Sequence, residues 1–261
     1  MSKVKKNKKL ILPENGNRTA LPVSNTEDEI TQFRKNQACF AEQYDKVFPD
    51  KLAPKTVVII PSMTMDQEIL SKIKGITFYE ERLLCMLLLL RMPRTHVVYV
   101  TSMPVDPVIV DYYLHLLPGI TGQHAQKRLH LISCYDSSTK SLTEKILERP
   151  RIIERIKQSI PVNHIAHMAC FNVTNLERKL AVQLGLPVYG CDPDLLHLGN
   201  KSNSRKIFKQ CGLSAPAGYE DLYTEKDIAD ALIKLKKKNS LLRKAVTVSY
   251  THLTLPTIYS V

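Results

Sequence analysis

The chain has 261 residues, of which 44% are hydrophobic and 24% are charged, so it can bury the core of one large domain or two smaller ones. Its longest apolar run, residues 83–90, is far shorter than the roughly 20 residues that span a bilayer, which argues against a membrane protein. The formal charge of +12 would suit a nucleic-acid partner, but no nucleic-acid-binding motif accompanies the lysines, so we expect solvated basic segments instead.

The cysteines are scattered through apolar segments, without a CxxC pair or zinc-ligand spacing. We interpret them as buried, reduced thiols, which predicts a cytoplasmic protein. They are Cys39, Cys85, Cys134, Cys170, Cys191 and Cys211.

Residues 1–32 are polar and show no hydrophobic periodicity, which predicts a disordered basic N-terminus. Order is expected to begin near Phe33. From there, short apolar runs that suit strands buried on both faces alternate with helical segments. The expected strands are residues 57–60, 97–100, 129–132, 165–171 and 187–190, and the helices between them are 66–74, 79–92, 107–117, 142–159 and 175–184.

This alternation predicts an α/β fold in residues 33–199, with a Rossmann-like, doubly wound and mainly parallel sheet. No GxGxxG motif follows the first strand, which argues against the usual dinucleotide site. For residues 200–246 we predict a second, incomplete unit, with helices at 201–210 and 225–238 and the beginning of a strand.

The final segment, residues 247–261, is interpreted as a translated sequencing adapter and is left out of the fold prediction. From Val248 the chain reads VSYTHLTLPT. The DNA sequence GTC TCT TAT ACA CAT CTG ACG CTG CCG ACG encodes that string and resembles the adapter of transposase-based libraries. We therefore expect the natural protein to continue beyond residue 246.

Few residues in the first unit carry a chemical signal. Glu80 and Glu81 open a predicted helix, where carboxylates favour the positive end of the dipole, so we interpret them as structural. His164 and His167 point to opposite faces of a strand and should not share a metal. Asn172 closes the fourth strand at the sheet edge where ligands usually bind, which makes it a candidate substrate contact beside the helix-capping Thr174.

The start of the second unit carries the strongest signal. Lys201 follows a Gly–Asn pair and opens a helix, so its ammonium group and the helix N–H groups could meet a phosphate together. Arg205 lies four residues on and shares that helix face, where it could reinforce the site or hold a domain interface. A solvated junction residue is the alternative for Lys201.

Five stretches of the chain resemble the pheganomycin-type peptide ligases of the ATP-grasp superfamily. The resemblance covers roughly residues 55–246. It rests on VVIIPSMTMD, YEERLLCMLLLLRMPRTHVVYVTSMPVDPVIVDYYLHLLPG, LTEKILERPRIIERI, FNVTNLERKLAVQLGLPVYGCDP and LGNKSNSRKIFKQCGLSAPAGYEDL.

The resemblance implies a pre-ATP-grasp domain followed by the start of an ATP-grasp fold near Lys201. It implies a reaction in which ATP phosphorylates a carboxylate and an amine or peptide attacks the acyl-phosphate, with Mg²⁺ bridging the phosphates. Family members carry the main ATP and magnesium ligands beyond the point where this chain departs. We therefore assign no catalytic residue and no metal ligand here, and expect the 261-residue chain to be inactive. The alternative is a non-catalytic Rossmann-like module that binds a small ligand.

Overall fold

The structure, a computed structural model, describes residues 27–47, 49–64, 67–247 and 257–260. The chain forms two compact units, Met1–Gly190 and Cys191–Val261. The sequence-based boundary at residues 199–200 lies inside the second unit, between its helices α9 and α10.

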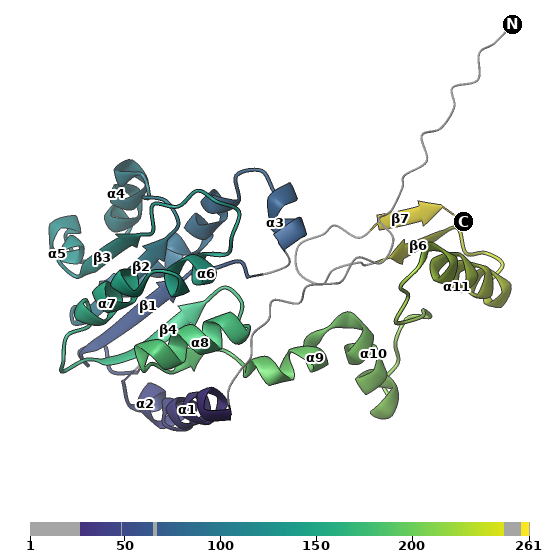
Figure 1. The fold of residues 1–261 in the computed structure, drawn as a ribbon, viewed down its shortest axis with the longest axis horizontal. Coiled ribbons are helices and arrows are strands. Elements are labelled where there is room, and N and C mark those ends of the chain that lie inside the picture. The colour runs from purple at the N-terminus through teal and green to yellow at the C-terminus, as the bar shows by residue number, and fades with distance from the viewer. Residues whose placement is uncertain (1–26, 48, 65–66, 248–256, 261) are drawn as a thin grey trace, which may run out of the picture. The chain divides into compact units, whose positions relative to one another are not determined.

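The first unit is built on a five-stranded sheet in the order β3-β2-β1-β4-β5, with all strands parallel (Figure 1). The strands are β1 Lys55–Ile60, β2 Thr95–Thr101, β3 Leu129–Ser133, β4 Ile165–Cys170 and β5 Val188–Tyr189. All five predicted strands are present, so the prediction of a Rossmann-like, mainly parallel α/β fold is confirmed. Every residue of β1 is buried, as expected of a central strand that is covered on both faces.

The two faces of the sheet pack into separate cores because side chains alternate along each strand. Val58 and Val98 belong to the core under α6, α7 and α8, whereas Val57 and Val97 belong to the core under η1 and α4. The helices of this unit are α3 Gln67–Lys72, η1 Ile76–Arg91, α4 Pro107–His115, α5 Gly122–Gln126, α6 Leu142–Leu147, α7 Pro150–Gln158 and α8 Asn175–Leu184.

The leucine-rich helix η1 has 3₁₀ geometry rather than the expected α form, and it starts at Ile76 instead of residue 79. Its fully buried leucines, Leu84, Leu87 and Leu90, recur every third residue, which matches the three residues per turn of a 3₁₀ helix. The buried Arg128 guanidinium bonds the carbonyls at the end of η1, at 2.7 Å from Leu90 O and 2.8 Å from Met92 O.

The single helix expected over residues 142–159 is two helices, because Pro150 begins a new one. α6 ends at Leu147 and Pro150 occupies the first turn of α7. Because proline has no N–H group to give an interior helical bond, the chain breaks before it and restarts.

The N-terminal helices are α1 Glu27–Ala38 and α2 Phe40–Val47, which corrects the prediction that disorder extends to residue 32. Glu27, Asp28 and Glu29 place negative charge in the first turn of α1, which stabilises a helix start, and Phe33 is buried in the core. Residues 1–26 lie outside the described residues.

The prediction that the cysteines are unpaired is confirmed, but the prediction that they are buried is wrong for four of them. All six thiols are free, but only Cys134 is buried and Cys170 partly so. The other four thiols are exposed: Cys39, Cys85, Cys191 and Cys211.

The second unit contains η2 Pro193–Leu195, α9 Leu196–Gly199, α10 Lys201–Gln210, α11 Glu225–Lys238, and the strands β6 Lys244–Thr247 and β7 Thr257–Ser260. The two predicted helices, α10 and α11, have the expected bounds. β7 lies in the tail that was left out of the fold prediction, and it pairs antiparallel with β6. Residues 248–256 and 261 lie outside the described residues, and the adapter origin of the tail stays a prediction.

Candidate functional site

The strand order reverses direction between β1 and β4, and in doubly wound sheets the carboxyl ends at such a reversal form the ligand-binding crevice. β1 is followed by Ser62 and Thr64, and β4 is followed by Asn172. The structure therefore places the predicted substrate contact at the switch point of the sheet.

Both polar atoms of the Asn172 side chain bond the main chain of Thr64. The amide nitrogen donates to Thr64 O at 2.8 Å, and the amide oxygen accepts from Thr64 N at 3.1 Å. This two-point contact clasps the loop after β1 to the loop after β4. Asn172 thus fixes the shape of the crevice wall, and a ligand bond from its side chain would replace one of these two bonds.

A buried chain of hydroxyl and carboxylate groups continues from this clasp. Thr64 Oγ1 lies 2.8 Å from Ser62 Oγ and donates to the Glu177 carboxylate. Glu177 also accepts from Thr174 N at 2.8 Å, which completes the predicted capping box of α8. Ser62 Oγ in turn accepts from Thr143 N in the first turn of α6. The loop after β1 is therefore tied to both α6 and α8.

Glu80 is a second buried group at the carboxyl edge, where it has a structural role as predicted, but not at a helix start. Its side chain is only 6% exposed and does not serve the start of a helix, because η1 begins at Ile76 and has no side-chain cap. The carboxylate accepts from Ser102 N and Ser102 Oγ, each at 2.5 Å, just after β2. Burial raises the pKa of Glu80 to about 7, although the Ser102 bonds and the nearby Lys145 charge oppose the shift.

Lys145 links this group to the end of β3. Its ammonium group is buried and donates to Ser102 Oγ and to Asp136 O, both at 2.9 Å. Burial lowers the pKa of Lys145. Bonds from Ser138 and from Arg149, whose guanidinium lies 2.6 Å from Asp136 Oδ2, lower the pKa of Asp136 to about 2.

Ser102 and Lys145 have the spacing of a nucleophile and its base, but both are fully buried, so no substrate atom reaches them. We interpret the Glu80–Ser102–Lys145 network as the group that holds the loops after β2 and β3 in one shape. The sequence gives no signal for it, because the three residues are far apart along the chain.

The predicted phosphate-contacting residues lie in the second unit. Lys201 is exposed in the first turn of α10, which is capped by the Asn200 side chain accepting from Asn203 N at 2.7 Å. Arg205 is paired with Glu220, its Nε lying 2.7 Å from Glu220 Oε1. The structure thus leaves Lys201 exposed beside a helix start and engages Arg205 within its own unit.

Two histidine clusters are separate, in line with the expectation that His164 and His167 point apart. The His164 ring meets the His96 ring edge-on at 4.7 Å between centroids, whereas His167 packs 5.4 Å from Phe40. His96 also stacks on His130 at 5.7 Å. Burial lowers the pKa of His96 to about 4.

The parts of the chain that the structure describes contain no group of three or more His, Cys, Asp or Glu side chains that could hold a metal ion. Within the same ranges, no helix is both long and apolar enough to span a membrane.

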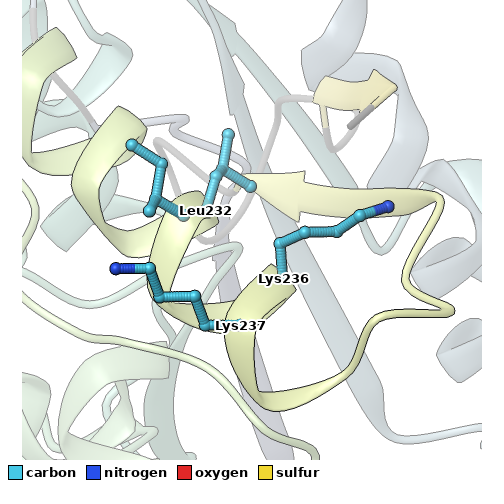
Figure 2. A pocket seen from close by; sticks show the side chains of 4 residues that line it. Leu232, Lys236 and Lys237 are labelled. Atoms are coloured by element: carbon cyan, nitrogen blue, oxygen red, sulfur yellow. The ribbon is translucent and has the colours of Figure 1, made fainter.

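A hollow of about 310 Å³ on α11 is lined by Leu232, Ile233, Lys236 and Lys237 (Figure 2). Lys236 is engaged with Leu242 O at 2.5 Å. The lining offers aliphatic surface and no converging set of polar groups, so the carboxyl edge of the sheet and the start of α10 remain the candidate sites.

Comparison with known proteins gives two relatives and no matching protein family or solved structure. Over 198 residues, 73% of this chain, the sequence is 24% identical to the L-propargylglycine–L-glutamate ligase of Streptantibioticus cattleyicolor. Over 203 residues, 72% of the chain, it is 26% identical to the IQ motif-containing protein H of Danio rerio. The matches cover 41% of the ligase and 19% of the second protein, so the chain spans less than half the length of either.

The likeness to a ligase is distant and does not extend to the finer pheganomycin type, which stays a prediction.

Proposed function

We propose that this chain is the amino-terminal part of an ATP-dependent carboxylate–amine ligase of the ATP-grasp superfamily. The observation that carries the proposal is the similarity to L-propargylglycine–L-glutamate ligase over nearly three quarters of the chain. The Rossmann-like first unit is the fold expected of a pre-ATP-grasp domain. Residues 200–246 would then be the start of the ATP-grasp domain, and a pheganomycin-type peptide ligase is the finer assignment.

In the proposed reaction, the γ-phosphoryl group of ATP passes to a substrate carboxylate, giving an acyl-phosphate and ADP. The nitrogen of an amine or peptide then attacks the acyl carbon, the amide bond forms, and inorganic phosphate leaves with the electron pair of the broken C–O bond. Mg²⁺ would neutralise phosphate charge when bound. Because the described residues offer no cluster for it, we assign its ligands to no residue of this chain.

Lys201 is the residue that we propose to contact a phosphate of ATP. It is exposed, it lies in the first turn of α10, and the N–H groups of that turn favour an anion. Arg205 is held by Glu220, so we propose that it positions α10 and reinforces the site through the helix. Asn172 would shape the substrate side by holding Thr64 in place.

Hydroxylamine trapping tests this proposal on the longer gene product that we expect. Acyl-phosphates react with hydroxylamine to give hydroxamates, so hydroxamate should appear only when ATP and the correct amino acid or peptide are both present. ATP-independent product, or no ADP release with any carboxylate tested, would remove the ligase assignment. The purified 261-residue chain should be inactive in the same assay.

A calorimetric comparison tests Lys201 separately. A charge-assisted bond to phosphate contributes about 1.5–3 kcal/mol, so Lys201→Ala should weaken ATP binding about ten- to a hundredfold. Lys206→Ala is the matched control, because Lys206 lies on the same helix in an exposed ion pair with Asp221 and should change ATP binding little. Equal ATP affinity of wild type and Lys201→Ala would exclude Lys201 from the site.

A non-catalytic binding module is the second candidate. It is favoured by the similarity to IQ motif-containing protein H, whose name carries no enzymatic activity and which matches this chain over a similar length. This candidate predicts a small ligand bound at the carboxyl edge without ATP turnover. An Asn172→Ala variant that loses ligand binding while the gene product consumes no ATP would favour it over the ligase.

A further inference from the structure

The two edges of the five-stranded sheet are treated differently by the rest of the chain. At the β5 edge, the side-chain amide of Gln37 takes the place of a neighbouring strand. Its oxygen accepts from Val188 N at 2.6 Å and its nitrogen donates to Val188 O at 3.0 Å. This edge is therefore closed by a residue of α1.

Among the described residues, none covers the main chain of the β3 edge in this way. Cys134 N donates to Thr101 O and Val97 N donates to Arg128 O, both at 2.9 Å, so the even-numbered residues of this segment face β2. By the pleat of a strand, the main-chain groups of Leu129, Leu131 and Ser133 then face away from the sheet. In the described ranges, no turn, loop or side-chain group bonds these outward N–H and C=O groups.

The composition of β3 would allow this edge to pair with another strand. Sheet edges in monomeric proteins are commonly protected by lysine, proline, a bulge or a covering segment. β3 reads LHLIS and contains no proline and no acid, lysine or arginine. At its centre, Leu131 is 43% exposed, which leaves an aliphatic side chain in water at an open edge.

We propose that β3 pairs antiparallel with β3 of a second copy of this chain, about a two-fold axis at Leu131. In that register Leu131 faces its own counterpart, and Leu129 faces Ser133 of the other copy. Each of these pairs exchanges two main-chain hydrogen bonds, so every outward group of the strand finds a partner. The two Leu131 side chains would also meet across the axis and leave water.

The occupant is a second copy because the strand complements itself. A two-fold contact brings identical surfaces together, so a charged strand would repel its copy, and this strand has no carboxylate, ammonium or guanidinium group. The closed β5 edge would limit assembly to a pair. The inference rests on the sheet edges alone and is independent of the proposed ligase activity.

The first test is the mass of the 261-residue chain in solution. Sedimentation equilibrium should give twice the chain mass of 29.7 kDa for the wild type. Leu131→Lys places two like charges face to face across the axis and should return the mass to that of the monomer. Val162→Lys, which adds the same charge at a fully exposed aliphatic residue away from β3, should remain dimeric. Circular dichroism confirms that each variant is folded.

Amide exchange gives a readout that follows the strand itself. In the dimer, the amides of Leu129, Leu131 and Ser133 should exchange more than about tenfold more slowly than in folded Leu131→Lys. The amides of His130 and Ile132 bond β2 and should be slow in both proteins. A monomeric wild type, a dimeric Leu131→Lys, or outward amides that exchange alike in both proteins would each overturn the proposal. Slow outward amides in a monomer would show that another segment of the chain covers the edge.

Discussion

Replacement of Glu80 by glutamine should remove a pH dependence from the stability of the first unit. The pKa of Glu80 is raised from 4.5 to about 7 in the folded protein, chiefly by burial. A raised pKa means that the folded state holds the proton more tightly than the unfolded state. The stability that Glu80 contributes is therefore fully present below pH 4.5 and is lost as the pH rises through 7.

The magnitude follows from the difference between the two pKa values, about 2.5 pH units. At about 1.4 kcal/mol per unit, the loss is on the order of 3 kcal/mol. Burial of the carboxylate decides the sign, because the Ser102 bonds and the Lys145 charge, which favour ionisation, are the smaller effects. If the Lys145 charge dominated instead, stability would rise with pH.

The assay is urea unfolding followed by far-UV circular dichroism at about pH 5 and about pH 8.5. The wild type should lose about 2.5 kcal/mol more unfolding free energy between these pH values than Glu80→Gln, whose amide oxygen can still accept from Ser102 N. Glu154→Gln, at an exposed position on α7, is the control and should follow the wild type. Equal pH slopes in wild type and Glu80→Gln would refute the account of the buried carboxyl.

Three further outcomes are expected. Arg128→Met should lower the unfolding free energy by about 3 kcal/mol in urea titration, because three buried carbonyl groups lose their hydrogen-bond donor. A loss below about 1 kcal/mol would contradict this. The pKa of His96 is lowered to about 4, so its contribution is present above pH 6.5 and lost as the pH falls; His96→Gln should make acid unfolding less steep than in the exposed-site control His124→Gln. Deletion of residues 248–261 should leave the melting temperature within about 4 °C, roughly 1 kcal/mol for a domain of this size, and a larger fall would count against the adapter interpretation.

The strands were predictable because a strand buried on both faces is a continuous apolar run in the sequence. Val57–Ile60 and Val97–Val100 are continuous β-branched and aromatic runs, and their alternation with helices implies parallel pairing. The capping box at Thr174 and Glu177 was equally local, since both residues lie within one turn. α5 was missed because a helix of one turn has no measurable hydrophobic period.

The interior of the candidate site could not be predicted, because its bonds join residues distant in sequence. Asn172 was placed correctly at the sheet edge, but its clasp on Thr64 depends on how β1 and β4 come together. Glu80 was taken for a residue at a helix start, since nothing in its neighbours along the chain shows that Ser102 will receive it. The exposed start of α10 at Lys201 was visible from the sequence, whereas the engagement of Arg205 with Glu220 was not.

Through the Gln37 amide, α1 covers the β5 edge of the sheet. Cleavage by a protease in the loop of residues 49–54, between α2 and β1, would remove the covalent link that keeps α1 on the sheet. Once α1 separates, Val188 N loses its acceptor on Gln37, whereas Val188 O keeps the bond from Gly190 N. A molecule that is open at β3 and at β5 can add a neighbour on either side, so a closed pair would give way to an open-ended fibre. If β3 pairs as proposed, α1 is therefore the element that limits the assembly to two copies, and its connection to β1 keeps it in place.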